Sequence, residues 1–264
     1  MNRIEKKFRR LRTEGRKGLI PFITAGDPSL GVTEKLICAL ESAGADIIEL
    51  GIPFSDPMAD GPVIQAASER ALKKGTTLEK VLRLVQKIRR KSSIPIVLMG
   101  YFNPILAMGI DRFAERAALA GVDGVLVVDL PPEEAVGLRK KLKEKGLNQI
   151  FLLAPTSDSE RIGRVVRLSS GYLYYVSLTG ITGAKLTLSG EIDRQIRQIR
   201  KRSPLPIVIG FGITSPNQAG QAASLADGVV IGSALVRLIG NGSPSGRVAR
   251  ASRLLSSIRN TLDS

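Results

Sequence analysis

Short runs of consecutive apolar residues alternate along the chain with longer stretches in which apolar residues recur every three or four positions. Each short run predicts a β-strand covered on both faces. Each longer stretch predicts an amphipathic helix, as at Leu78, Val81, Leu82, Val85 and Ile88. The pattern predicts eight strands, at residues 19–24, 46–51, 94–100, 124–129, 149–154, 172–177, 206–210 and 228–232.

Eight strand–helix units without a break in composition predict one closed α/β barrel, a (β/α)8 TIM barrel, with residues 1–264 as a single domain. An open doubly wound sheet is the alternative, although it normally uses fewer strands. An extra amphipathic helix is predicted before the first strand, because Ile4, Phe8 and Leu11 share one helical face.

Two connections are longer than the others. Most units occupy roughly 22 to 33 residues, but about 49 separate the centres of the second and third strands. This excess holds the loop IPFSDPMADGP and then a predicted extra helix at 63–74, and a second insertion, TGITGAKLTLSG, follows the sixth strand. Both loops are expected at the C-terminal mouth of the barrel, where the chemistry of this fold takes place.

Composition narrows the choice of partners and location. The net charge is +15, but the basic residues are spread over predicted helices, and aromatic residues make up only 4% with no Trp. Solvated helix exteriors explain this charge, so we expect no nucleic-acid partner. No apolar run reaches the roughly 18 residues of a membrane span, so no membrane association is expected. Cys38 is the single cysteine, which indicates a reducing, cytoplasmic location.

The chain contains no histidine, which excludes Ser-His-Asp triads, Cys-His pairs and histidine-based metal sites. No cysteine cluster replaces it, and we expect no metal; proton transfer must therefore use carboxylates, Tyr or Lys. Glu49 lies near the end of an apolar strand, where we expect a partly desolvated carboxylate with a raised pKa. Asp60 lies in the following loop, but these residue positions leave the choice open among Asp27, Asp56, Asp60 and Asp129.

Glycine-rich segments follow the sixth, seventh and eighth strands, at 180–183, 210–213 and 232–233. Glycine lets backbone N–H groups approach a phosphate closely, and a helix N-terminus adds a favourable dipole. Any one cluster is explained by a tight turn. Three at one face of a barrel favour a phosphate site.

Five motifs together resemble the tryptophan synthase α subunit family: PFITAGDP (21–28), ELGIPFSDPMADGPVIQ (49–65), DLPPEE (129–134), TGITGA (179–184) and GFGI (210–213). They occur in order over nearly the whole chain. The resemblance implies a barrel enzyme that cleaves indole-3-glycerol phosphate to indole and glyceraldehyde 3-phosphate by a retro-aldol reaction, without a cofactor.

The resemblance also assigns residues. It implies that Glu49 is the general acid/base, that Asp60 holds the indole N–H, and that Thr182 closes over the substrate and contacts Asp60. It implies phosphate binding by Gly183, Gly212, Gly232 and Ser233. It implies an indole pocket lined by Phe22, Met99, Leu126, Tyr174 and Phe211, residue types that plain core packing explains equally well. For Tyr174, the neighbouring Tyr172 and Tyr175 offer alternative registers.

The partner implied by the resemblance is a pyridoxal-phosphate-dependent β subunit, in an α2β2 heterotetramer. Docking would use the loop at Pro53, Phe54, Asp56 and Pro57, and residues 102–104. A rigid loop that only positions Asp60 is the alternative interpretation of that segment. Two other functions stay open: a free-standing lyase that needs no β subunit, and a catalytically silent barrel that acts as a binding module.

Overall fold

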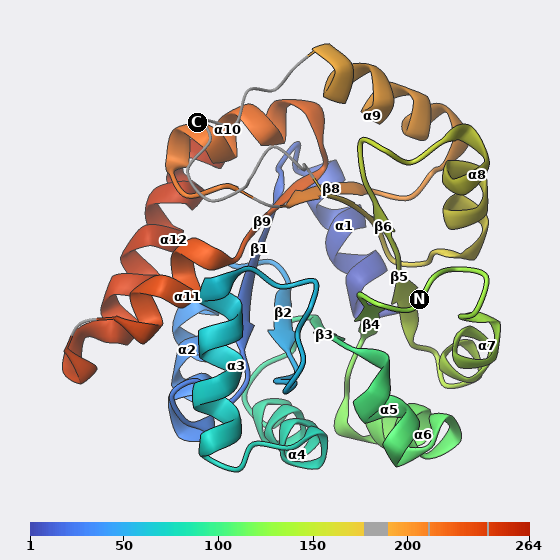
Figure 1. The fold of residues 1–264 in the computed structure, drawn as a ribbon. Coiled ribbons are helices and arrows are strands. Elements are labelled where there is room, and N and C mark those ends of the chain that lie inside the picture. Colours follow the sequence, from blue (N-terminus) through green and yellow to red (C-terminus); the bar gives the residue numbers. More distant parts are fainter. Residues whose placement is uncertain (177–189, 211, 242) are drawn as a thin grey trace.

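The computed structural model describes residues 1–176, 190–210, 212–241 and 243–264, and within them the chain forms a nearly closed parallel barrel surrounded by helices (Figure 1). Neighbouring strands follow the order β5-β4-β3-β2-β1-β9-β8-β7-β6. The strands are β1 (Gly18–Thr24), β2 (Ile48–Gly51), β3 (Ile96–Gly100), β4 (Gly124–Val127), β5 (Asn148–Ile150), β6 (Leu152–Leu153), β7 (Leu173–Val176), β8 (Ile207–Gly210) and β9 (Gly228–Ile231).

The eight predicted strands are confirmed, and each occupies one position around the barrel. The predicted fifth strand is interrupted at Phe151, so that β5 pairs with β4 and β6 pairs with β7. The helices are α1 (Arg3–Thr13), α2 (Leu30–Ser42), α3 (Pro62–Lys73), α4 (Leu78–Ile88), α5 (Phe102–Met108), α6 (Ile110–Ala120), α7 (Val136–Glu144), α8 (Ser159–Leu168), α9 (Gly190–Arg202), α10 (Pro216–Leu225), α11 (Ser233–Gly240) and α12 (Arg247–Asp263).

Successive side chains along each strand point alternately into two apolar cores, one between the strands and the helices and one inside the barrel. On β2, Ile48 and Leu50 belong to the outer core between the strands and the helices, whereas the preceding Ile47 belongs to the core inside the barrel. Glu49 therefore points inward from the middle of a buried strand. The strand pattern thus carries a carboxylate into the barrel interior.

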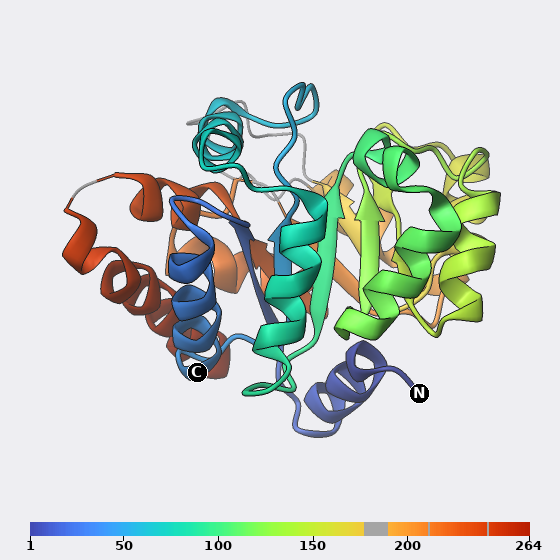
Figure 2. The ribbon, with the colours of Figure 1, turned by 90° about the horizontal axis from the view of Figure 1, so that it is seen from below.

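The N-terminal helix α1 covers the end of the barrel opposite the long β2–α3 loop (Figure 2). Asn2 caps the helix by accepting a hydrogen bond from the Ile4 amide. Ile4, Phe8 and Leu11 are buried and join the inner core, as their spacing predicted. The Phe8 ring lies 5.8 Å from the ring of Tyr172, so α1 packs against the floor of the barrel interior.

At the same end of the barrel, an aspartate stands at or just before the start of three of the apolar strand segments. Each carboxylate accepts a hydrogen bond from an amide near the start of a neighbouring strand and pairs with an arginine in a helix or directly after one. The aspartates are Asp46, Asp123 and Asp227. These pairs stabilise the closed end, which leaves the opposite mouth free for function.

The extra helix predicted at 63–74 is confirmed as α3, and it lies at the mouth with the β2–α3 loop (Figure 2). The short helix α5 after β3 was not predicted. Its first amide, that of Phe102, donates a hydrogen bond to the Asp129 carboxylate across the mouth.

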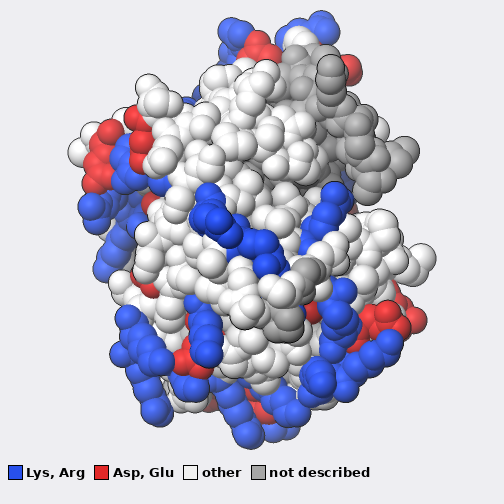
Figure 3. Space-filling view, turned by 90° about the vertical axis from the view of Figure 1, so that its left-hand side faces the viewer, with Lys and Arg blue, Asp and Glu red and all other residues white. Residues whose placement is uncertain are grey.

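Many of the basic residues lie on helix exteriors, where several form ion pairs with acidic residues four positions away, such as Arg10 with Glu14 and Arg83 with Glu79. Figure 3 shows Lys and Arg interspersed with acidic and uncharged residues on one side of the molecule. This arrangement agrees with solvated helix faces. In the part of the chain that the structure describes, no helix is both long enough and apolar enough to cross a membrane.

Candidate active site

Glu49 is completely buried inside the barrel. Its Oε1 atom accepts a hydrogen bond of 2.7 Å from the Tyr172 hydroxyl, and Oε2 has no hydrogen-bond partner among the described residues. Burial raises the pKa of Glu49 to about 8, and the hydrogen bond from Tyr172 partly opposes this. The raised pKa is as predicted, but desolvation is complete and not partial, because the Glu49 side chain has no exposed surface inside the barrel. Glu49 is therefore a protonated acid at neutral pH.

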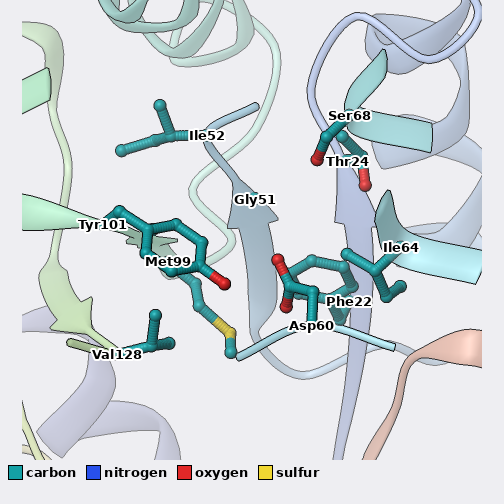
Figure 4. A pocket seen from close by; sticks show the side chains of 11 residues that line it. Phe22, Thr24, Gly51, Ile52, Asp60, Ile64, Ser68, Met99, Tyr101 and Val128 are labelled. Carbon is teal, nitrogen blue, oxygen red and sulfur yellow. The ribbon is translucent and has the colours of Figure 1, made fainter. Parts of the chain in front are cut away.

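Asp60 lies at the mouth, in a pocket formed by the ends of β1, β2 and β3 and by α3 (Figure 4). Burial raises the pKa of Asp60 to about 6, and a hydrogen bond from the Tyr101 hydroxyl lowers it in part. The same hydroxyl accepts a hydrogen bond of 3.0 Å from the Ala59 amide, which ties the loop to β3. At neutral pH Asp60 is mostly ionised, the opposite state from Glu49.

The structure separates Asp60 from the other three aspartates considered above. Asp27 is buried in an ion pair with Arg70, and Asp129 accepts the Phe102 amide. Asp56 is exposed and accepts a hydrogen bond from Ser55. Of these four aspartates, Asp60 is the one that lines the pocket.

Four of the apolar residues named for an indole pocket lie in the Asp60 pocket or in the barrel interior that holds Glu49. Phe22 and Met99 line the Asp60 pocket, and Phe22 is also the cross-strand neighbour of Glu49. Leu126 and Tyr174 lie in the inner core. Gly51 makes room for Phe22, because a Cβ atom there would lie 2.7 Å from the end of the Phe22 ring.

The register of the three tyrosines is now settled. Tyr172 and Tyr174 face the barrel interior, whereas Tyr175 faces outward and donates a hydrogen bond to Gln195. Tyr174 is close enough to Glu49 for that carboxylate to contribute to its raised pKa, after burial.

Gly212 and Gly232, from two of the glycine-rich segments, lie at the same mouth. Gly212 follows β8 and has a φ of +74°, a conformation that favours glycine. Gly232 precedes α11, whose first amides have no partner within the helix and point toward the mouth. A Cβ atom on Gly232 would lie 3.8 Å from the Cβ of Phe22, so the N-terminus of α11, with Ser233, adjoins the apolar pocket. Thr182, Gly183 and Phe211 lie outside the described residues.

Two tyrosines at the site were missed by sequence reasoning as functional residues. Tyr172 contacts Glu49, and Tyr101 contacts the Asp60 loop. A signal existed for both: Tyr101 directly follows a predicted strand, and Tyr172 is two positions before Tyr174 and therefore on the same face.

Comparison with known proteins agrees with this geometry. The family model described as tryptophan synthase alpha chain matches residues 8–261. The alpha chain of Geotalea daltonii is 59% identical over 90% of both chains, and that of Dechloromonas aromatica is 51% identical over 100% of this chain and 98% of its own.

Solved structures give the same result. The alpha subunit from Legionella pneumophila superimposes with a TM-score of 0.91 at 44% identity, covering 100% of this chain and 99% of its own. A chain of the tryptophan synthase complex from Pyrococcus furiosus gives a TM-score of 0.84 at 35% identity, covering 93% of this chain and 99% of its own. This chain therefore belongs to the tryptophan synthase alpha chain family.

Proposed function

We propose that this chain cleaves indole-3-glycerol phosphate to indole and glyceraldehyde 3-phosphate by a retro-aldol reaction in which Glu49 and Asp60 act as a pair. Family membership makes the chain a carbon–carbon lyase of tryptophan biosynthesis. The observation that carries the assignment of residues is that burial places the pKa of Glu49 at about 8 and that of Asp60 at about 6. Two carboxyl groups held in opposite protonation states at neutral pH supply an acid and an anion.

Glu49 is the acid of the pair. Indole is a poor leaving group until its C3 atom is protonated, and the buried, protonated carboxyl of Glu49 donates that proton. As the bond between C3 and the glycerol chain breaks, its electrons return to the ring. Glu49 then takes a proton from the glycerol hydroxyl that becomes the aldehyde, which restores its starting state.

Asp60 is the anion of the pair. Protonation at C3 places positive charge on the indole nitrogen, and the ionised carboxylate of Asp60 accepts the N–H and stabilises that charge. The partly buried pocket strengthens the interaction, because fewer water molecules screen it. Phe22, Met99, Leu126 and Tyr174 supply the apolar surroundings of the ring.

The phosphate end of the substrate is assigned to Gly212, Gly232 and Ser233. Support comes from the free amides at the N-terminus of α11 and from its position beside Phe22. The assignments of Gly183 to the phosphate, of Phe211 to the indole and of Thr182 to a closing loop remain predictions from the resemblance.

Carboxamide variants test the catalytic pair. We expect Glu49→Gln and Asp60→Asn each to lower kcat for indole release by about 10² to 10⁴-fold. Inhibition by glyceraldehyde 3-phosphate should persist, because the phosphate site is separate. Glu69→Gln on the exposed face of α3 is a matched control. Near-normal turnover by Glu49→Gln would show that the acid/base assignment is wrong.

We also propose that the chain works with a β subunit in an α2β2 heterotetramer, docking through the loop at Phe54, Asp56 and Pro57 and through residues 102–104. Pro53, which the sequence had also suggested, is buried within this chain. The Phe54 ring stacks on Tyr101 at 5.2 Å, which couples this loop to the Asp60 pocket. Exposed apolar side chains stand on both segments or next to them: Met58 is 93% exposed and Leu106 56%. The Pyrococcus neighbour comes from a tryptophan synthase complex.

Indole release by the purified chain, measured with and without a β subunit, tests this partnership. Acceleration on adding the β subunit is expected. Full activity of the isolated chain, with no acceleration, would instead support a free-standing lyase.

A further inference from the structure

The helix α3, which directly follows Asp60, has little apolar surface with which to hold its position. Its buried side chains are Ala67, Ser68 and Ala71, all small. Val63 and Ile64 are only partly buried against the inner core. Burial stabilises in proportion to apolar area, so these contacts restrain α3 weakly. Another interaction must fix where the helix lies on the mouth.

That interaction is an ion pair with two hydrogen bonds between Arg70 on α3 and Asp27 in the turn after β1. The Nε and Nη2 atoms of Arg70 lie 2.8 Å from the two carboxylate oxygens of Asp27. Asp27 is only 2% exposed, while the Arg70 side chain is 38% exposed. A forked, charge-assisted pair of this kind fixes both distance and orientation, which a single Lys contact does not.

The Arg70 guanidinium also lies against the end of a second helix. Gly240 is the last residue of α11, and a Cβ atom there would lie 2.6 Å from Nη2 of Arg70. The cation therefore lies at the C-terminus of α11, where the helix dipole favours positive charge. A third contact holds the far end of α3: a Cβ atom on Gly26, next to Asp27, would lie 2.1 Å from Oγ1 of Thr76 in the turn after the helix.

Arg70 thus joins the two elements that hold opposite ends of the substrate in the function proposed above. The first, α3, begins two residues after Asp60, and the second, α11, begins at Ser233 in the phosphate site. We propose that Arg70, held by Asp27, is a positioning residue for the cleavage reaction. It fixes the Asp60 loop relative to the phosphate-binding helix, so that the indole nitrogen meets the carboxylate when the phosphate is bound. This inference rests on the proposed function.

The test compares Arg70→Ala, Arg70→Lys and, as a matched control on the same helix, Lys73→Ala, which removes an exposed ion pair with Glu69. The readouts are kcat and KM for indole-3-glycerol phosphate, and the inhibition constant of glyceraldehyde 3-phosphate. Misplacement by about 1 Å costs up to about 100-fold in rate. We expect Arg70→Ala to lower kcat by about 10- to 100-fold with a smaller change in KM, Arg70→Lys to recover part of the loss, and Lys73→Ala to behave as wild type.

The inhibition constant separates misplacement of the Asp60 loop from damage to the phosphate site. It should stay within about twofold in Arg70→Ala, since α11 itself is intact, whereas damage to the phosphate site would raise it. A smaller folded fraction would lower the apparent kcat and leave KM and the inhibition constant unchanged, so kcat is calculated per folded molecule, with the folded fraction taken from circular dichroism. Arg70→Ala also strands the buried Asp27 carboxylate, which is destabilising. The double variant Asp27→Asn/Arg70→Gln removes both charges together and is measured alongside, with circular dichroism as a check on folding.

The kcat values of the variants decide whether Arg70 positions the Asp60 loop. A folded Arg70→Ala or double variant with wild-type kcat overturns the positioning role, as does a loss shared equally by Lys73→Ala. If the wild-type chain itself releases no indole, with or without a β subunit, the proposed function fails instead. The two failures are therefore distinguishable.

Discussion

Replacing Tyr172 by Phe removes the one hydrogen bond that the described structure gives to the Glu49 carboxyl group, while it keeps an aromatic ring in place. The Tyr172 hydroxyl donates to Oε1 of Glu49 at 2.7 Å, and the Tyr172 ring packs on Phe8 at 5.8 Å. Phe preserves that packing and deletes only the hydroxyl. The variant therefore changes the protonation of Glu49 with little effect on the barrel.

The size of the effect follows from the two opposing causes of the Glu49 pKa. Burial raises the pKa to about 8, and the Tyr172 hydrogen bond lowers it because it favours the ionised form. A hydrogen bond to a charged group contributes about 1.5–3 kcal/mol, and about 1.4 kcal/mol corresponds to one pKa unit. Tyr172→Phe should therefore raise the pKa of Glu49 by about 1–2 units.

The pH dependence of kcat/KM reports this change, because it reflects groups of the free enzyme. Activity needs Asp60 ionised and Glu49 protonated, so we expect a bell with limbs near 6 and near 8 in the wild type. In Tyr172→Phe the alkaline limb should move up by about 1–2 units. The acid limb should stay, although the substrate phosphate also titrates near 6, which makes the alkaline limb the diagnostic one.

A tyrosine three positions further along the chain provides the control. Tyr175 faces outward and donates to Gln195, so Tyr175→Phe should leave both limbs unchanged. An alkaline limb that stays in place or moves down in Tyr172→Phe would refute the reasoning, because Glu49 would then not be the group that limits activity at high pH.

Three other changes give independent tests. The pKa of Glu49 is about 8 in the folded chain and 4.5 for a free carboxyl group, so the free energy of unfolding should fall as pH rises between these values, by up to about 1.4 kcal/mol per pH unit. Urea unfolding should show that Glu49→Gln lacks this fall. The same pH dependence in wild type and variant would contradict the raised pKa. Tyr101→Phe removes the hydrogen bond that lowers the pKa of Asp60, so the acid limb of kcat/KM should move above about 6; an unmoved limb would argue against Asp60. Gly212→Ala strains a residue at φ +74° and should raise KM; an unchanged KM would indicate a turn without phosphate contact.

Much of the architecture could be read from the chain because it depends on local periodicity. The apolar runs marked all eight barrel positions, and the spacing of Ile4, Phe8 and Leu11 identified the helix that closes the barrel floor. The same reasoning placed Glu49 on a buried strand near the mouth. A carboxyl group on such a strand is desolvated, and for Glu49 desolvation is the larger of the two causes that set its pKa.

Other features depend on which distant segments meet. Tyr172, Tyr174 and Tyr175 cannot be told apart by residue type. Only the register of β7 in the barrel turns two of them inward. The four aspartates were equivalent in the sequence until folding gave Asp27 a partner 43 positions away, in Arg70.

The sequence by itself therefore determined the alternation of eight strands with helices, the amphipathic helix α1 and the inward-facing Glu49. The tertiary structure decided that Asp60 lines the pocket, that Tyr172 donates to Glu49 and that Arg70 joins α3 to β1 and α11. The physical reason is one of range. A repeating pattern of apolar residues specifies an element through its immediate neighbours, whereas burial, pKa and ion pairing are set by residues that come close only when the barrel closes.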